Sequence, residues 1–402
     1  MLLHAHSRPP PMSVAGRRPA VVVNVGWVAG VSAIRSLGRA GVPVHAVDHR
    51  PDALGFRSRY TTAGHICPRR LDDEEAFVAF LGALGDRLGG GAPLFLLDDD
   101  DLNAVARRRE VLGDRFLYPF PEWETLERIQ DKAHQVKRAR ELGVPVPRTT
   151  REPTDELGFP VLVKPFQPGA FRRRFGVKAF RCESRGELEQ AWERARGYEP
   201  LVWEFVPGGD RELYTLGSYV TRDGEALGLF CGRKLRQDPP TIGNARVAES
   251  GWVDDVAVDG LRLLRGLGFH GPSQVEFKRD PRDGVYKLME VNPRLWQWHE
   301  LATACGVDLP LIAYRDLLGD APQPRPMRPR RMRWAITFKQ DKRPMPQLPP
   351  YVDPLLHLDD PAVAVGHLRR VAAGARAELP RVLDQLRRSP SSAAAGTGAP
   401  RV

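Results

Sequence analysis

Two short segments, QVEFK (274–278) and MEVNPR (289–294), determine how this chain is interpreted, because they predict neighbouring strands of a hairpin. Glu276 and Glu290 stand fourteen residues apart, and the period of two along a strand places Glu290 and Asn292 on one face. A short hairpin can bring Glu276 alongside them. Two carboxylates and an amide oxygen on a rigid sheet form a hard oxygen site, which is what Mg²⁺ prefers.

Arg294 lies two residues beyond Asn292, so it would add a guanidinium to the same face. A guanidinium there suits a phosphate or a developing negative charge. An edge hairpin with solvated acids and an arginine partner explains the same spacing equally well. The pattern therefore leaves a metal–phosphate site and a plain hairpin open.

Two lysines occur in settings that favour a polyphosphate site. Lys164 lies inside the apolar strand VLVKPF (161–166), where a lysine needs a partner or a cleft. Lys132 follows Asp131 on the preceding predicted helix (122–142). Together the two cations would neutralise phosphates, although Lys132 taken alone fits a surface helix position better.

The segment QPGAFRRRFGVK (167–178) is predicted to be a loop, because it combines two glycines with three arginines and Lys178. Backbone freedom and dense positive charge suit a lid that closes over phosphates. A solvated basic turn is the alternative. The chain contains no GxxxxGK[ST] motif, so this loop is not a Walker P-loop.

The segment VWEFVPGGDRE (202–212) predicts a strand that breaks at PGGD and exposes backbone N–H and C=O groups. These groups could hydrogen-bond a purine, and either Asp210 or Glu212 could accept hydrogen bonds from ribose hydroxyls. A plain hairpin loop is equally consistent with the local pattern.

The N-terminal part of the chain alternates between buried strands and helices. AVVVNV (20–25), VPVHAVD (42–48) and PLFLLD (93–98) predict strands with helical stretches between them, which indicates a parallel sheet. Beyond residue 200, strands follow one another more directly. The fold class is therefore α/β, with α+β character in the second half.

Composition limits the classes of protein further. The 402 residues have a net charge of +10, and removing the charges of residues 1–20 (+3), 321–345 (+7) and 346–402 (+2) leaves −2 on 21–320. The basic 321–345 segment contains Trp334 and Phe338, so binding to nucleic acid is an alternative, although an arm packed on the acidic body or a solvated tail is favoured. The chain contains no run of about 18 apolar residues, so no membrane helix is predicted.

The first residues do not resemble a secretory signal, and the four cysteines are far apart, so we expect a reducing, cytoplasmic setting. We expect no membrane partner and leave a homodimer open.

In their order along the chain, these segments resemble the ATP-grasp superfamily. The elements that carry the resemblance span about residues 20–320 and are DK (131–132), FPVLVKP (159–165), the basic loop, EFVPGGDRE (204–212), VEF (275–277) and MEVNPR. Two further segments, GRKLRQDPPTIGNA (232–245) and NPRLWQWHELATACGVDLP (292–310), are similar to predicted ATP-dependent carboxylate–amine ligases, a subgroup that includes D-aspartate ligases.

The resemblance implies a pre-ATP-grasp, Rossmann-like N-terminal domain followed by an ATP-grasp fold whose two subdomains clamp ATP. The boundaries expected from it are a disordered N-terminus (1–19), the N-terminal domain (20–120), the ATP-grasp domain (121–320, with a lid subdomain at about 145–205), a Pro/Arg-rich extension (321–387) and a disordered tail (388–402).

The resemblance also implies roles for residues at matching positions. Lys132 and Lys164 would contact the ATP phosphates; Glu204, Phe205 and Val206 would form the adenine hinge; and Glu212, with Asp210 as the alternative, would bind the ribose. Glu276, Glu290 and Asn292 would hold Mg²⁺ or Mn²⁺, and Arg294, Arg236 and Lys178 would act in catalysis. Substrate contacts are assigned to Trp296, Trp298, His299, Asp100 and Asp101.

Two of these assignments have alternatives, since His299 could be a packed structural residue and the acidic run DDDD (98–101) a solvated helix start. The chain also departs from the superfamily in two places. Its basic loop lacks a run of small residues, and its hinge is one residue longer than in D-alanine ligases.

The expected function is an ATP-dependent carboxylate–amine ligase that forms an amide through an acyl phosphate and releases ADP and phosphate. A carboxylase or a carbamoyl-phosphate-type enzyme is the alternative within the family. An alternative outside the family is an NAD-dependent oxidoreductase, because a dinucleotide-binding unit would resemble VVVNVGWVAG (21–30) followed by a strand that ends at Asp48. However, the segment has only Gly26 and Gly30 and lacks the full GxGxxG pattern.

Overall fold

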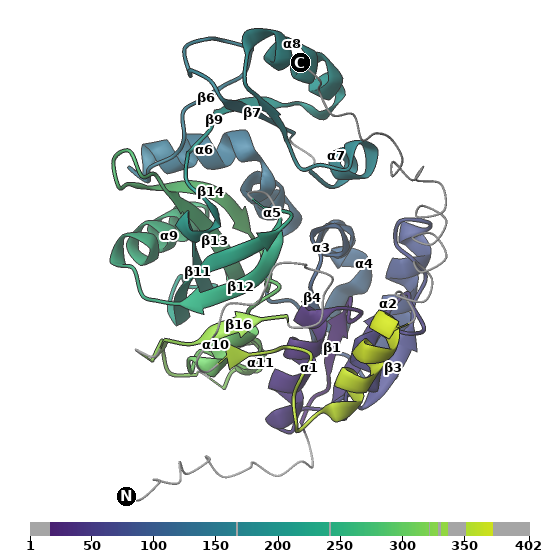
Figure 1. Cartoon of the computed structure of the whole chain (residues 1–402). Coiled ribbons are helices and arrows are strands. Elements are labelled where there is room, and N and C mark those ends of the chain that lie inside the picture. The colour runs from purple at the N-terminus through teal and green to yellow at the C-terminus, as the bar shows by residue number, and fades with distance from the viewer. Residues whose placement is uncertain are drawn as a thin grey trace, which may run out of the picture.

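The N-terminal part of the fold is a parallel sheet made from the apolar segments predicted as strands (Figure 1). We describe it from a computed structural model, which covers residues 17–165, 168–240, 243–320, 322–328, 331–336 and 351–372. Strands β1 and β4 are completely buried because helices cover both faces, as parallel sheets require. The strand order is β3-β2-β1-β4-β5, with all pairs parallel; the strands are β1 (Ala20–Val23), β2 (Val44–Asp48), β3 (Ala63–Ile66), β4 (Ala92–Leu96) and β5 (Phe116–Leu117).

Helices on the two faces of this sheet contribute to two separate cores. Helix α1 packs on one face, and α2 and α3 pack on the other. The helical segments of this part are α1 (Val28–Arg39), η1 (Leu54–Arg57), α2 (Glu74–Arg87), α3 (Asp99–Arg107), α4 (Arg109–Leu112) and η2 (Gly113–Arg115).

An eight-stranded, mostly antiparallel sheet forms the second part, in the order β14-β13-β10-β11-β12-β16-β17 with β15 beside β11. Its strands are β10 (Leu213–Val220), β11 (Ala226–Asp238), β12 (Asn244–Ser250), β13 (Gly271–Arg279), β14 (Tyr286–Asn292), β15 (Arg325–Pro326), β16 (Arg333–Ala335) and β17 (Tyr351–Val352). One face shares a core with α5 (Trp123–Gln130), α6 (Lys132–Glu141) and α9 (Asp254–Gly266). The other shares one with α10 (Glu300–Ala304) and α11 (Leu309–Leu317).

A four-stranded antiparallel sheet with its own small core lies at the top of Figure 1. Its order is β6-β9-β7-β8, and all of its strands fall within the range predicted for the lid subdomain. The elements of this part are β6 (Thr149–Thr150), β7 (Val161–Lys164), α7 (Pro168–Phe175), β8 (Phe180–Cys182), α8 (Arg185–Ala195), η3 (Arg196–Tyr198) and β9 (Leu201–Glu204); η4 (Asp210–Glu212) follows it.

Two local predictions were wrong. The helix expected over 122–142 is interrupted at Asp131, whose extended backbone ends α5 and whose carboxylate accepts hydrogen bonds from the N–H groups of Ala133 and His134 at the start of α6. Most of the segment 167–178, expected to be a loop, forms the helix α7, and Phe171 on this helix is completely buried. An apolar anchor of this kind stabilises a short helix that its arginines alone would not.

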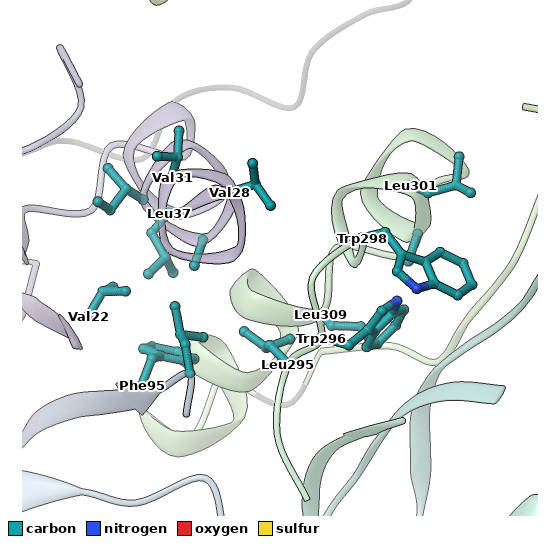
Figure 2. Close-up of a cluster of buried hydrophobic side chains, with 14 of the residues drawn as sticks. Val22, Val28, Val31, Leu37, Phe95, Leu295, Trp296, Trp298, Leu301 and Leu309 are labelled. Carbon is teal, nitrogen blue, oxygen red and sulfur yellow. The ribbon is translucent and has the colours of Figure 1, made fainter. Parts of the chain in front are cut away.

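One hydrophobic core joins the N-terminal sheet to the eight-stranded sheet. Figure 2 shows Val28 and Val31 of α1 on one side and Trp296, Trp298 and Leu309 on the other, and all of these residues belong to one buried cluster. The two parts are therefore held together by shared apolar burial as well as by the chain between them.

The segment after residue 320 contains regular structure, although the nine prolines between 321 and 354 predict an extended connection without it. Within its described residues it adds β15 to β11 and β16 to β12, and a helix at 361–372 lies near α1 (Figure 1). Asp360 forms a buried ion pair with Arg35 of α1, with Nε to Oδ2 at 2.8 Å. The predicted disorder of 1–19 and 388–402 falls on residues outside the described ranges, except for 17–19. No helix among the described residues is long and apolar enough to cross a membrane.

Candidate active site

The hairpin of β13 and β14 places the predicted acids in one row. Glu276 lies directly opposite Glu290, and Gln274 lies opposite Asn292. Gln274 donates from Nε2 to Glu276 Oε1 at 3.0 Å and accepts from Asn292 Nδ2 at 3.2 Å. Because the Asn292 amide nitrogen is engaged in this way, its Oδ1 is the atom that could bind a metal together with the two carboxylates.

Four lysines surround this row: three lie on α6, β7 and β11, and the fourth, Lys178, lies in the connection between α7 and β8. Lys132 Nζ lies 3.5 Å from Glu290 Oε1, and Lys234 Nζ lies 2.8 Å from Glu276 Oε1. Burial alone would raise the pKa of Glu290, but the charges of four lysines lower this pKa to about 2; they are Lys132, Lys178, Lys164 and Lys234. If all four lysines are protonated, they carry two more positive charges than the two carboxylates neutralise, which suits a polyanion.

The lysines themselves lack enough negative charge nearby. Burial, with the charge of Lys132, lowers the pKa of Lys164 to about 7, and its ammonium lies 4.1 Å from the centre of the Trp203 ring. Burial also lowers the pKa of Lys178, although Glu290 and Glu276 oppose that effect. A polyphosphate bound here would supply the missing negative charge.

Lys234 was not identified from the sequence. This lysine is buried on β11. Strand pairing connects Gly232 through Thr215 to Glu276, and Lys234 lies two residues beyond Gly232, so its side chain points to the same face as Glu276. The signal was present, because a lysine in the strand following ALGLFCG needs a buried partner just as Lys164 does.

Arg294 is held by a carboxylate from the N-terminal part of the fold. Its Nε and Nη2 donate to the two oxygens of Asp99 at 2.7 and 2.8 Å, and its Nη1 donates to the Leu295 carbonyl at 3.2 Å. Burial would lower the pKa of Arg294, but the carboxylates of Asp99, Asp98 and Glu290 raise it above its usual value. Asp99 was not identified from the sequence, although it belongs to the acidic run 98–101.

The two acids of that run that were assigned to substrate are engaged in ion pairs. Asp100 lies 3.1 Å from Arg70 and 3.3 Å from Arg173 of α7, and Asp101 lies 3.0 Å from Arg70. Burial and the charge of Asp98 raise the pKa of Asp101 to about 7. The run also begins helix α3, whose N-cap Asp98 accepts from the Asp100 N–H at 3.0 Å. The helix-start interpretation therefore describes its position, although the acids are paired rather than merely solvated.

The predicted adenine hinge follows β9. Glu204 is buried; its carboxylate accepts from the Arg148 backbone N–H at 3.0 Å and from Arg282 at 2.5 Å. Burial would raise the pKa of Glu204, but these hydrogen bonds and the charge of Lys287 lower it overall. The Val206 carbonyl accepts from Lys278 Nζ at 2.8 Å, and the Phe205 ring lies 4.4 Å from the guanidinium of Arg181.

The two candidate ribose acids differ in how firmly they are held. Asp210 accepts two hydrogen bonds from Gln237, at 2.8 Å from the backbone N–H and 3.0 Å from Nε2. The Glu212 carboxylate lies 3.8 Å from Arg279, and 27% of its side chain is exposed. Glu212 is therefore the acid better able to rearrange toward a ligand.

Three residues assigned to the substrate are placed in the hydrophobic core instead. Trp296, Trp298 and His299 are each 1% exposed, and Trp296 fills the space beside Gly217. Figure 2 shows the two tryptophans within the buried cluster. His299 Nε2 lies 3.1 Å from the Ala29 carbonyl of α1. We therefore correct this assignment, since the packed structural alternative explains all three. Arg236 lies half-buried on β11, opposite Val247 and near an irregularity in the strand register.

Two alternatives lie outside the family: an NAD-dependent oxidoreductase and a nucleic-acid-binding protein. In both cases, the described residues that suggested the alternative contact other parts of the protein. A Cβ on Gly26 would lie only 1.5 Å from Arg50 Nη2, so the end of the Arg50 side chain lies against this glycine. Trp334, proposed to stack on bases, is completely buried. Phe338 lies outside the described residues.

Comparisons with known proteins point to one group of enzymes. No protein-family model matches the chain. The chain is 26% identical over 251 residues to the D-aspartate ligase of Enterococcus faecium (strain Aus0004), a match that covers 57% of this chain and 59% of that protein. The chain thus spans less than two thirds of the length of this relative.

Solved structures match most of the described fold. An L-amino acid ligase from Bacillus licheniformis superposes with a TM-score of 0.57 and 18% identity, covering 75% of both chains. A biotin carboxylase from Campylobacter jejuni, solved as a β,γ-ATP complex, gives a TM-score of 0.60 and 17% identity over 75% of this chain and 71% of that one.

Proposed function

We propose that this chain, which has the fold of the ATP-grasp enzymes that resemble it, is an ATP-dependent carboxylate–amine ligase. The sequence-based resemblance to that superfamily is confirmed at the level of the fold and of its relatives. The observation that carries the proposal is the row of Glu276, Glu290 and Asn292 with four lysines around it.

The domain boundaries remain part of this proposal. We assign residues 20–120 to the N-terminal domain and 121–320 to the ATP-grasp domain, with the four-stranded sheet as the lid. Lys164 and Lys178 would then come from the lid, while Lys234 comes from the sheet that carries the acids.

The residues fit a divalent cation such as Mg²⁺ or Mn²⁺. Glu276 and Glu290 supply two carboxylates and Asn292 one amide oxygen, a donor set that magnesium uses when phosphates and water complete its shell. Among the described residues, no group of three or more His, Cys, Asp or Glu side chains could hold a metal. Bound by Glu276, Glu290 and Asn292, the cation would neutralise phosphate charge during transfer.

The protein groups have distinct roles in binding ATP. The phosphates would lie among Lys132, Lys164, Lys178 and Lys234, whose excess charge they neutralise. The backbone at 204–206 would hold the adenine, and Glu212 the ribose. Since Lys278 already binds the Val206 carbonyl, the adenine would compete with or extend that contact.

The reaction follows from the weakness of a carboxylate as an acylating agent. A carboxylate oxygen of the substrate attacks the γ-phosphorus, the bond from that phosphorus to the β–γ bridging oxygen breaks, and ADP leaves. The amine nitrogen then attacks the acyl carbon, inorganic phosphate leaves, and the nitrogen releases its proton to phosphate or water. Fixed lysines and Arg294 accelerate such steps by positioning and by stabilising charge.

A carboxylase or carbamoyl-phosphate-type activity is the second candidate, because a biotin carboxylase shares the fold. The first step would be the same, with bicarbonate as the carboxylate. Release of ADP with bicarbonate alone, without an organic acid, would favour this candidate over the ligase.

The experiment is a screen for ADP release with Mg-ATP and pooled amino acids and amines, followed by mass measurement of the product. D-Aspartate is the first carboxylate to test because of the D-aspartate ligase relative. A product whose mass equals acid plus amine minus water supports the ligase. ADP release that no acid–amine pool stimulates would rule it out.

A further inference from the structure

Arg294 and Asp99 lie 195 positions apart in the sequence and join two parts of the fold. Arg294 follows β14 of the eight-stranded sheet, whereas Asp99 is the first residue of α3, beyond the end of β4 in the N-terminal sheet. Both oxygens of the carboxylate are used, at 2.7 and 2.8 Å, so the pair is bidentate. A bidentate pair fixes the plane of the guanidinium as well as its position.

The donors of Arg294 can be counted. A guanidinium has five N–H groups. Asp99 takes one on Nε and one on Nη2, and the Leu295 carbonyl takes one on Nη1. Within the part of the chain that the structure describes, these contacts leave one N–H on each terminal nitrogen for a ligand, and such a pair can act as a second fork that matches two oxygens of a phosphoryl or carboxylate group.

Stability alone does not account for this pair. The side chains of Arg294 and Asp99 are 21% and 42% exposed, and ion pairs this accessible to water contribute little to folding. The neighbouring acids have other contacts, because Asp98 caps α3 while Asp100 and Asp101 pair with Arg70. Within the acidic run, Asp99 is thus the residue dedicated to Arg294.

We propose that Asp99 is a positioning residue that holds Arg294 with its second fork toward the phosphoryl group being transferred. The N-terminal domain would then set the geometry of the catalytic arginine. This inference rests on the proposed function, since it requires phosphoryl transfer at this site. Asp99, a member of the acidic run, would then act in the transfer of the phosphoryl group from ATP and would not contact the substrate directly.

The test measures the affinity for Mg-ADP with and without fluoroaluminate, a mimic of the phosphoryl group in transfer that requires no knowledge of the substrate. In the wild type, fluoroaluminate is expected to tighten Mg-ADP binding. Arg294→Ala should lose that increase in affinity. In Asp99→Ala the increase should be smaller than in the wild type by a factor of about ten or more, because misalignment of a catalytic group costs at least that much. Affinity for Mg-ADP alone should stay within about twofold, since the inference assigns Asp99 no contact with the nucleotide.

Three further variants separate positioning from a structural effect. Asp99→Asn keeps one acceptor oxygen and should retain part of the gain. The double variant D99A/R294A should match R294A, because Asp99 is expected to act only through Arg294. Asp86→Ala breaks an exposed Asp–Arg pair, with Arg115 at 2.7 Å, and should behave as the wild type.

The outcomes are distinguishable. If the wild type does not bind Mg-ADP, the proposed function and this inference both fail. If the wild type binds Mg-ADP but fluoroaluminate adds nothing, the role of Arg294 and the inference fail. Full tightening in D99A, or an equal loss of affinity for Mg-ADP alone, overturns the positioning role of Asp99 while leaving the ATP site in place.

Discussion

Glu290 and Glu249 belong to the same eight-stranded sheet, and cations lower the pKa of each to about 2, but they do so in different ways. Glu249 is 3% exposed and accepts charged hydrogen bonds from three arginines at 2.9 to 3.2 Å; they are Arg233, Arg331 and Arg333. Glu290 is 39% exposed on its side chain, with Lys132 at 3.5 Å and three other lysines acting through their charge.

The strand registers place these two acids on opposite faces. Strand pairing connects Glu290 across the sheet to Ser250 on β12, so these two side chains point to the same face. Glu249 precedes Ser250 on that strand, and its side chain therefore points to the opposite face. The carboxylate of Glu249 has its oxygens saturated and joins β16 to the sheet. The carboxylate of Glu290 is charged but not saturated, which leaves its oxygens able to bind a metal.

The largest expected effect is on Glu290. We predict that Glu290→Gln lowers the rate of ADP release by about 10²–10³-fold, the range seen when a preorganised electrostatic group is removed. The amide would leave the four lysines without the carboxylate that opposes them. The assay is ADP release at saturating Mg-ATP, with circular dichroism to verify the fold. Release at the wild-type rate would refute the metal assignment.

For Glu249, the effect should fall on stability instead. Glu249→Gln is expected to lower the free energy of unfolding by about 2–4 kcal/mol, because it weakens several buried, charged hydrogen bonds at once. ADP release per folded molecule should stay near the wild-type rate. Denaturant unfolding measures the first quantity and the ADP assay the second; an activity loss like that of Glu290→Gln would remove the contrast between the two acids.

The free energy of unfolding should also depend on pH differently in the wild type and in Glu249→Gln. The folded pKa of about 2 lies below the usual value of 4.5, so the charge of Glu249 stabilises the fold above pH 4.5 and this contribution is lost as pH falls toward 2. The difference in unfolding free energy between the wild type and Glu249→Gln should therefore shrink over that window. A difference that stays constant from pH 6 to pH 2 would contradict the pairing.

The smallest effect concerns a proton at Lys164. With its pKa near 7, this lysine is partly neutral at pH 7.5, and bound phosphates should raise that pKa. ATP binding is then expected to take up a fraction of a proton, which calorimetry in buffers of different ionisation enthalpy detects. Lys164→Met should reduce the uptake, and Lys137→Met, an exposed position on α6, should not. Equal uptake in all three proteins would count against the position of Lys164 at the phosphates.

The features that the sequence predicted well are local. The hairpin of β13 and β14, with Glu276 beside Glu290, follows from the period of two and a nearby turn. The alternating strands and helices of the N-terminal sheet follow from apolar runs of the right length.

The features that were missed or wrong depend on distant partners. Asp99 and Lys234 gain their importance from Arg294 and Glu276, which other parts of the chain bring to them. Trp296 and Trp298 were assigned to the substrate with the family resemblance, but a core shared with α1 buries them. No local pattern reports which long-range surface will cover a side chain.

The buried pair of Arg35 and Asp360 has a consequence for the order in which the chain is made. Arg35 is 0% exposed on α1, and its ion-pair partner follows 325 residues later. Until that segment is made, α1 lacks both the carboxylate that pairs with Arg35 and the residues around 354–363 that help to cover it, so packing of this side chain into a core would be costly. We expect the N-terminal sheet to stay loosely packed on the ribosome, and to become protease-resistant only after residue 360 has left the exit tunnel.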